Sequence, residues 1–120
     1  HPSPAMPICS PMKPFPTKKL YHRRAEILKA LAHPSRLLIV DVLHDRGELC
    51  VCDLEKVVGS DQSTVSKHLS ILKQSGIIDL RRDGKNSMYR LARPCVMTFF
   101  ECIEQVMKEN LKEQRELLAS

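Results

Sequence analysis

Several features that would point to other classes of protein are missing from this sequence. Trp is absent, and aromatic residues make up only 4% of the 120 residues. No apolar run approaches the ~20 residues that a membrane-spanning helix needs, so we expect no membrane partner. The five histidines show no metal-binding spacing, and the chain has no HExxH motif, no Gly-rich phosphate loop and no Ser/His/Asp arrangement. The sequence therefore gives almost no support for an enzyme.

A disulfide framework is also not expected, although cysteine is present. The five cysteines are an odd number, and they stand at positions 9, 50, 52, 95 and 102. The first sixteen residues, HPSPAMPICSPMKPFP, are rich in proline and lack the apolar stretch of a secretory signal. We therefore expect reduced thiols and a cytoplasmic location. We expect residues 1–17 to form a flexible N-terminal arm and residues 18–120 to form a single domain.

Charge gives the first positive indication of a partner. Lys and Arg outnumber Asp and Glu by 19 to 14, which makes the formal net charge +5. This balance favours a polyanionic partner, with nucleic acid as the first candidate. Because many basic proteins bind no nucleic acid, a non-DNA interaction module remains an alternative.

The apolar spacing predicts a series of helices. We expect helices over residues 18–32, 35–47, 53–58 and 60–76, with the second as the central one. In the fourth segment Val65, Leu69 and Leu72 form an apolar stripe, while polar and basic residues occupy the other side. Ser60 or Asp61 is the expected N-cap. Two helices joined by a tight turn, the second with a small, polar, basic face, predict a helix-turn-helix.

A hairpin and a last helix complete the predicted fold. Residues 77–91 split around Asp83-Gly84 into two alternating apolar and polar runs, which is typical of a β-hairpin. The fold class is therefore mainly α with a small β-wing, a winged helix-turn-helix of about five helices and one hairpin. Pro94 is expected to begin the last helix. Its broad apolar stripe needs a partner, and a second copy of the chain is the plausible one.

The predicted second helix of the helix-turn-helix carries the side chains that could read DNA. The major groove admits one helix, and base edges are read by groups that donate and accept hydrogen bonds. The candidates are Gln62, Ser63, Thr64, Ser66, Lys67 and His68 on the helix, with Arg81, Arg82, Lys85 and Arg90 on the wing. The alternatives are a solvated amphipathic helix and an ordinary charged turn. The charge and the wing together favour double-stranded DNA.

The segment ELCVCDLEKVVG, residues 48–59, places two thiols one residue apart. Inside a regular helix Cys50 and Cys52 would point roughly 200° apart, so they can converge only where the backbone is irregular. The start of a helix is such a place, and it also favours the thiolate. Thiolates bind As(III), Cd(II), Pb(II) and Zn(II). Two small buried apolar side chains, or a thiol redox switch, remain alternatives.

Two thiols rarely complete a metal site, so further donors are needed. Cys9 is the natural third ligand, and Asp53 or Glu55 could add oxygen. Cys95 and Cys102 share one face of the last helix but lie ~10 Å apart along its axis, too far for a shared ion without another ligand. We interpret these two as core or interface residues, with a second thiol site as the alternative.

Three segments of the sequence resemble a known family. The segments ILKALAHPSRLLIVDVL, GELCVCDLEKVVGSDQSTVSKHLSILKQSGII and LRRDGKNSMYRL are similar to the ArsR/SmtB family of metal-sensing repressors, over roughly residues 20–108. The resemblance implies a winged-helix homodimer that binds operator DNA when free of inducer and releases it when the inducer binds.

The same resemblance assigns roles to individual residues. ELCVCDL is similar to the metal box of the arsenic-responsive and cadmium/lead-responsive branches, so Cys50 and Cys52 are implied inducer ligands and residues 62–68 the recognition helix. The third cysteine of one arsenic-responsive type is Glu55 here, the arm has only Cys9, and Cys95 and Cys102 occupy the region of the zinc-sensor ligands. We rank As(III) or Sb(III) first as inducer, ahead of Cd(II), Pb(II) or Zn(II), because a site with three nearby thiols suits a trivalent ion.

Overall fold

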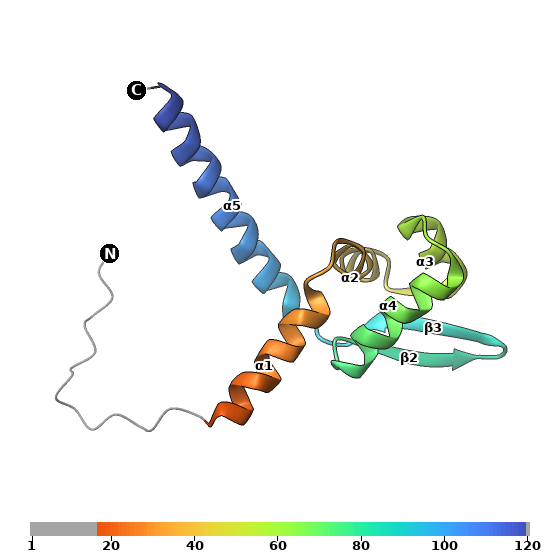
Figure 1. The fold of residues 1–120 in the computed structure, drawn as a ribbon. Helices are drawn as coiled ribbons and strands as arrows, with labels where there is room; N and C mark the ends of the chain where they lie inside the picture. The colour runs from red at the N-terminus through yellow and green to blue at the C-terminus, as the bar shows by residue number, and fades with distance from the viewer. Residues whose placement is uncertain (1–16, 120) are drawn as a thin grey trace.

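The computed structural model describes residues 17–119 and confirms the predicted fold class. In chain order the elements are α1 (Lys18–Leu31), α2 (Pro34–Arg46), β1 (Glu48–Cys50), α3 (Val51–Val58), α4 (Gln62–Gln74), β2 (Ile78–Asp83), β3 (Asn86–Leu91) and α5 (Val96–Ala119). Figure 1 shows α3 and α4 beside each other, with the β2–β3 hairpin extending next to them.

The core lies among α2, α3, α4 and the base of the hairpin. Ile39, Val40 and Leu43 of α2 are at most 1% exposed, in agreement with the prediction that this helix is central. The predicted stripe of α4, Val65, Leu69 and Leu72, is 0% exposed. Helical spacing therefore identified correctly the side of α4 that packs inward.

The sheet has one strand more than the sequence predicted. The strand order is β1-β3-β2, and both neighbouring pairs are antiparallel. Strand β1 was expected to be irregular chain, but its residues pair with β3, with Cys50 opposite Met88. A strand of three residues is too short to display a period of two, so its sequence carries no recognisable alternation.

The hairpin turn lies one residue later than the Asp83-Gly84 pair suggested. Asp83 pairs with Asn86, which leaves Gly84 and Lys85 as the two turn residues. Gly84 has φ of +63°, and the described residues other than glycine all have negative φ. A positive φ at the first turn position only is the type II′ arrangement, which fits the twist of paired strands.

The helix boundaries differ from the predicted ones by one or two residues. Helix α3 begins at Val51 rather than Asp53, and α5 begins at Val96 because Pro94 and Cys95 form a turn before it. Gly47 ends α2 as predicted, with φ of +89° and its N–H donated to the Leu43 carbonyl.

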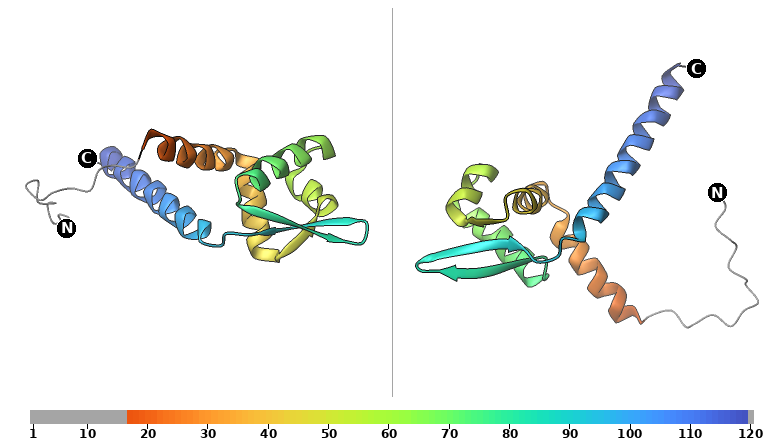
Figure 2. Two further views of the ribbon diagram at one scale, coloured as in Figure 1. Left: turned by 90° about the horizontal axis from the view of Figure 1, so that it is seen from below. Right: turned by 180° about the vertical axis from the view of Figure 1, so that it is seen from behind.

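Helices α1 and α5 extend from one end of the molecule, and the hairpin tip points away from them (Figures 1 and 2). The side chains of Val96, Met97 and Phe100 join α5 to the core, but no residue of α5 is buried. In the described part of the chain, no helix is long and apolar enough to cross a membrane.

Candidate nucleic-acid interface and thiol site

Helices α3 and α4 form a compact helix-turn-helix. Gly59 ends α3 in the left-handed conformation, with φ of +74°, and donates its N–H to the Glu55 carbonyl. Two residues later the Asp61 carboxylate accepts the Thr64 N–H at 2.8 Å and caps α4. Of the two predicted caps, the structure therefore selects Asp61. This hydrogen bond lowers the pKa of the Asp61 carboxyl below its usual value.

The outward side of α4 carries most of the predicted DNA-contacting residues. Gln62, Ser63, Thr64, Ser66 and Lys67 are all exposed. They come from the first two turns of the helix and lie opposite the buried stripe. Their side chains offer hydroxyl, amide and ammonium groups on one convex surface, and the size of one helix suits the major groove.

His68 does not belong to this surface, and its assignment as a DNA contact is not supported. Its side chain is only 7% exposed, and it is the one buried polar residue among the described positions. The ring faces His33 and Arg36 at the start of α2. His68 lies three residues after Val65 and four before Leu72, which is core spacing. We therefore leave it out of the candidate DNA-contacting set.

The predicted wing cations fall into two kinds. Arg81 donates to both carboxylate oxygens of Glu48, at 2.9 and 3.1 Å, across the width of the sheet. This hydrogen bonding lowers the pKa of Glu48 and raises that of Arg81. Arg90 makes a longer contact of 3.5 Å with Asp79. Arg82 and Lys85 lie nearer the turn and are exposed, so they are the better placed pair for phosphate contacts.

The two thiols of the ELCVC segment lie at the junction of a strand and a helix. Cys50 ends β1 and is the N-cap residue of α3, with extended backbone at φ −80° and ψ 168°. Cys52 is in the first turn of α3. The two cysteines therefore do not lie together within a regular helix, as their spacing required for convergence, because a strand-to-helix junction separates their backbone conformations. Cys52 is exposed and Cys50 is half-buried, so these thiols are not simply core packing.

An oxygen donor lies beside the first thiol. The Cys50 thiol donates to Asp53 Oδ2, with sulfur and oxygen 3.3 Å apart. Within residues 17–119 no group of three or more Cys, His, Asp or Glu side chains could hold a metal ion. Cys9 lies outside the described residues. Cys95 and Cys102 are exposed on the α5 side of the molecule.

A second surface is apolar. Leu20, Ile27 and Leu28 of α1 and Phe99, Ile103 and Val106 of α5 are between 39% and 54% exposed. A groove of about 470 Å³ runs between these helices, with Ile27, Leu31, Val96 and Phe99 in its walls and Cys95 beside them. The apolar stripe predicted for the last helix is thus uncovered in the single chain.

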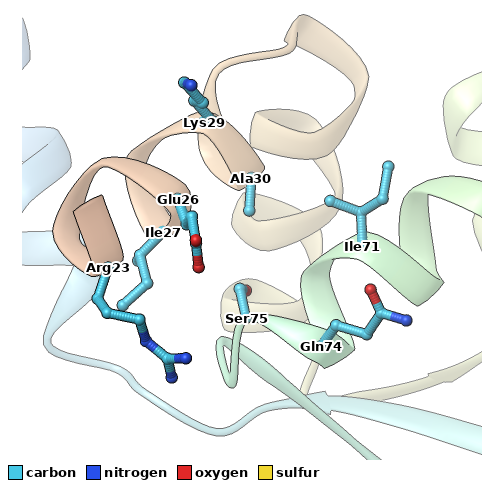
Figure 3. A pocket seen from close by; sticks show the side chains of 8 residues that line it. All are labelled: Arg23, Glu26, Ile27, Lys29, Ala30, Ile71, Gln74 and Ser75. Carbon is cyan, nitrogen blue, oxygen red and sulfur yellow. The ribbon is translucent and has the colours of Figure 1, made fainter. Parts of the chain in front are cut away.

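A third surface feature is a groove of about 380 Å³ between α1 and α4. Figure 3 shows Arg23, Glu26 and Lys29 on one wall and Gln74 and Ser75 on the other. Because both signs of charge line it, the groove selects no single class of charged ligand. We assign it no ligand.

Sequence reasoning missed three residues that support these surfaces. They are Glu48, which pairs with Arg81, and His33 and Arg36, which contact His68. Pairing across a sheet cannot be read without the strand order, so Glu48 gave no signal. His33 could have been found, because it precedes Pro34 at a helix start, where a side-chain acceptor is favoured.

Comparisons with known proteins agree with this geometry. A family model described as "Bacterial regulatory protein, arsR family" matches residues 33–79. A cadmium resistance transcriptional regulatory protein CadC homolog of Staphylococcus aureus is 37% identical over 93 residues, covering 78% of this chain and 71% of the relative. The arsenical resistance operon repressor of Escherichia coli is 43% identical over 67 residues, covering 56% of this chain and 57% of the relative.

A solved structure shows the same architecture. The homodimeric winged helix-turn-helix DNA-binding domain of a Mycobacterium bovis protein, described as a possible ArsR-family transcriptional regulator, superposes with a TM-score of 0.69. It is 33% identical, and the match covers 80% of this chain and 88% of that domain.

Proposed function

The chain belongs to the ArsR family of bacterial regulatory proteins, and from that membership we propose that its homodimer releases operator DNA when a thiophilic ion binds Cys50 and Cys52. The protein is a transcriptional regulator with a winged helix-turn-helix, and its partners are operator DNA and a second copy of itself.

The observation that carries the DNA part of the proposal is the arrangement of α4. A fully buried stripe fixes the helix, and the opposite face presents five exposed polar or basic residues, Gln62, Ser63, Thr64, Ser66 and Lys67. Placed in the major groove, these side chains contact base edges and phosphates. Arg82 and Lys85 contact the flanking backbone, with Arg81 and Arg90 behind them on the wing. The net charge of +5 supports binding to a polyanion.

The exposed apolar face of α1 and α5 supports the dimer. A 24-residue helix without a single buried side chain is unusual in a domain of this size. A twofold partner that supplies the same two helices covers both faces at once. Two copies then present two α4 helices to successive turns of one DNA duplex.

For the inducer site we propose Cys50, Cys52 and Cys9 as ligands, with Cys95 and Cys102 as less favoured donors. As(III) or Sb(III) is the first candidate inducer, because three thiols suit a trivalent ion. Cd(II), Pb(II) and Zn(II) are the second candidates, because they also accept the carboxylate oxygen that Asp53 holds beside Cys50. The named roles of two relatives, in cadmium resistance and in an arsenical resistance operon, support ions of this kind.

The position of the thiols supports a coupling between ion and DNA. Cys50 belongs both to β1, which pairs with wing strand β3, and to the start of α3, which packs against α4. An ion that draws Cys50 and Cys52 together displaces β1 and α3, and through them wing strand β3 and helix α4. Its differential affinity for the two dimer states sets the effect, and ~1–3 kcal/mol corresponds to ~5–150-fold weaker operator binding.

A release experiment tests the proposal. The DNA preceding the protein's own gene is bound in reductant, and arsenite or Cd²⁺ is then titrated. We expect the wild type and the C95S/C102S control to release the DNA when the ion is added. We expect the C50S/C52S variant to bind the DNA as well as the wild type does, but not to release it when the ion is added. The control removes the same number of thiols from the other end of the molecule. Normal release by C50S/C52S contradicts the ligand assignment.

The second candidate is a thiol-based redox switch on the same fold, which the exposure of Cys52, Cys95 and Cys102 favours. Anaerobic titration separates the two. A sulfur-to-metal charge-transfer band at stoichiometric ion supports the ion sensor. Release that needs an oxidant, without such a band, supports the redox switch.

A further inference from the structure

Two histidines and one arginine meet where α1, α2 and α4 join, on the inner side of the recognition helix. His33 precedes α2, and its Nδ1 accepts the Ser35 N–H at 3.0 Å. A ring nitrogen can accept only while it carries no proton. The cap of α2 therefore requires His33 without a proton on Nδ1.

Arg36 imposes the same condition on His68. Its Nη1 lies 3.2 Å from His68 Nδ1. A guanidinium group only donates hydrogen bonds, so His68 Nδ1 is the acceptor and the ring proton is on Nε2. Nη2 of the same guanidinium is 3.5 Å from the Lys29 carbonyl at the end of α1. One arginine thus connects α1 and α2 to the buried face of α4.

The surroundings of His68 oppose a positive charge. The His33 and His68 ring centroids are 4.4 Å apart, with the planes tilted by 51°. Arg36 and His33 face His68 from the start of α2, and Lys67 adjoins it on α4. Burial lowers the pKa of His68, and these three basic groups lower it further. The Nε atom of Arg36 is buried and has no hydrogen-bond partner, in either side chains or backbone, among the described residues.

We propose that His33 and Arg36 are positioning residues, which hold the recognition helix in its DNA-binding place only while the His68 imidazole that they contact is neutral, so that operator binding weakens in mild acid. This inference rests on the proposed operator binding. Protonation of His68 places a second N–H against the Arg36 guanidinium. The hydrogen bond is then lost, and two cations meet on the inner face of α4.

The direction of the effect distinguishes it from simple electrostatics. Acid adds positive charge at exposed histidines, which strengthens attraction to DNA. If a neutral His68 positions the recognition helix, acid instead weakens operator binding. The folded-state pKa of His68 lies below its ordinary value. The stabilisation that neutral His68 gives to the position of α4 is therefore fully present at a pH above the ordinary pKa, and it is lost as the pH falls through the lowered, folded-state pKa.

Asparagine provides the test substitution at both positions. Its amide oxygen occupies the place of a histidine Nδ1, accepts the same hydrogen bond and does not titrate. Asn is also a favoured N-cap, so His33→Asn preserves the start of α2. The matched control is His44→Asn, an exposed histidine in the last turn of α2.

The experiment compares operator Kd at about pH 7.5 and about pH 5.5, at constant ionic strength, for each protein. We expect Kd to rise about tenfold in acid for wild type and H44N, within the usual range of coupling between sites. We expect no rise for H33N/H68N. An unchanged or falling wild-type Kd, or an equal rise in H33N/H68N, overturns the inference. Circular dichroism at both pH values must show folded protein, since global unfolding of the wild type also overturns it.

A measurement on the free dimer keeps the inference separate from the proposed function. Ring ¹⁵N shifts at pH 7.5 should show the Nε2–H tautomer for His33 and His68. Amide exchange in α4 should quicken as His68 takes up its proton. Absence of operator binding at pH 7.5 contradicts the proposed function, and the inference is then decided by these shifts and exchange rates. A different tautomer, or unchanged exchange, overturns it.

Discussion

At the scale of single residues, Asp61 and His68 both support the structure of α4. Asp61 satisfies one of the free N–H groups at the helix start, and His68 occupies a place in the buried stripe. Both roles are structural, although Asp61 lies beside the predicted recognition helix and His68 lies within it. Whether a polar residue of this helix is available for DNA contact or supports the fold therefore depends on its position on the helix surface rather than on its chemical type.

The Asp61 cap leads to a prediction about stability. We expect Asp61→Ala to lower Tm, because the Thr64 N–H loses its acceptor, and Asp61→Asn to leave Tm close to wild type, because Asn also caps well. The folded-state pKa of Asp61 lies below its ordinary value, so the cap's charge contribution is present above that value and is lost as pH falls through the folded one. Thermal melts at neutral and strongly acid pH measure this. A constant difference between wild type and Asp61→Ala across pH would contradict the role of the charged carboxylate.

Residue assignments from sequence succeeded where a helical period decided them. The stripe Val65, Leu69 and Leu72 was predicted and is buried. His68 was predicted to contact DNA because its chemistry suits that role, but its spacing fits the core and its side chain is buried. The DNA-contacting and ion-binding assignments of the other residues remain predictions.

At the scale of elements, the strand β1 matters beyond its three residues. It pairs with β3, and Glu48 reaches past β3 to Arg81 on β2. The ion pair therefore joins the two outer strands of the sheet. Helices and the hairpin were predictable because each has its own period or turn signal. Strand β1 was not, because its existence depends on a partner about forty residues later.

The ion pair leads to a prediction about DNA binding. In Glu48→Gln the side-chain shape is kept, but Arg81 no longer faces a carboxylate. We expect tighter operator binding at low salt, and a steeper plot of log Kd against log salt by about one unit if Arg81 then contacts a phosphate. Glu109→Gln on α5 is the control, since it changes the net charge equally but lies far from the sheet. Weaker binding by Glu48→Gln alone would instead mean that the ion pair orients the wing.

At the scale of the whole molecule, the two ends carry different kinds of surface. The hairpin and α4 present polar and basic groups, whereas α1 and α5 present apolar ones. The sequence predicted the apolar stripe of the last helix and the polar, basic face of α4, but not that these surfaces lie at different ends of the molecule. How α1 and α5 diverge could not be predicted, since no local pattern fixes the angle between helices far apart in the chain (Figure 2).

The apolar end leads to a prediction about assembly. Ile103 lies in the middle of the α5 stripe and is 41% exposed, whereas Leu118 near the end of the helix is 88% exposed. We expect Ile103→Glu to raise the dimer dissociation constant by at least about tenfold, because symmetry places the charge in the interface twice. Leu118→Glu should stay dimeric. Analytical ultracentrifugation measures both, and a fully dimeric Ile103→Glu at low concentration would place the interface elsewhere.

No residue separates β1 from α3, because Cys50 closes the strand and Val51 opens the helix. A loop inserted there would take up a displacement of either element in its own torsion angles, so that the strand and the helix could move independently. Without such a loop, a displacement of Cys50 moves the end of the strand and the start of the helix at once, because this one residue ends β1 and caps α3. In the proposed sensor, substitutions at Cys50 and Cys52 would therefore change which ion is bound while the exposed face of α4 stays the same.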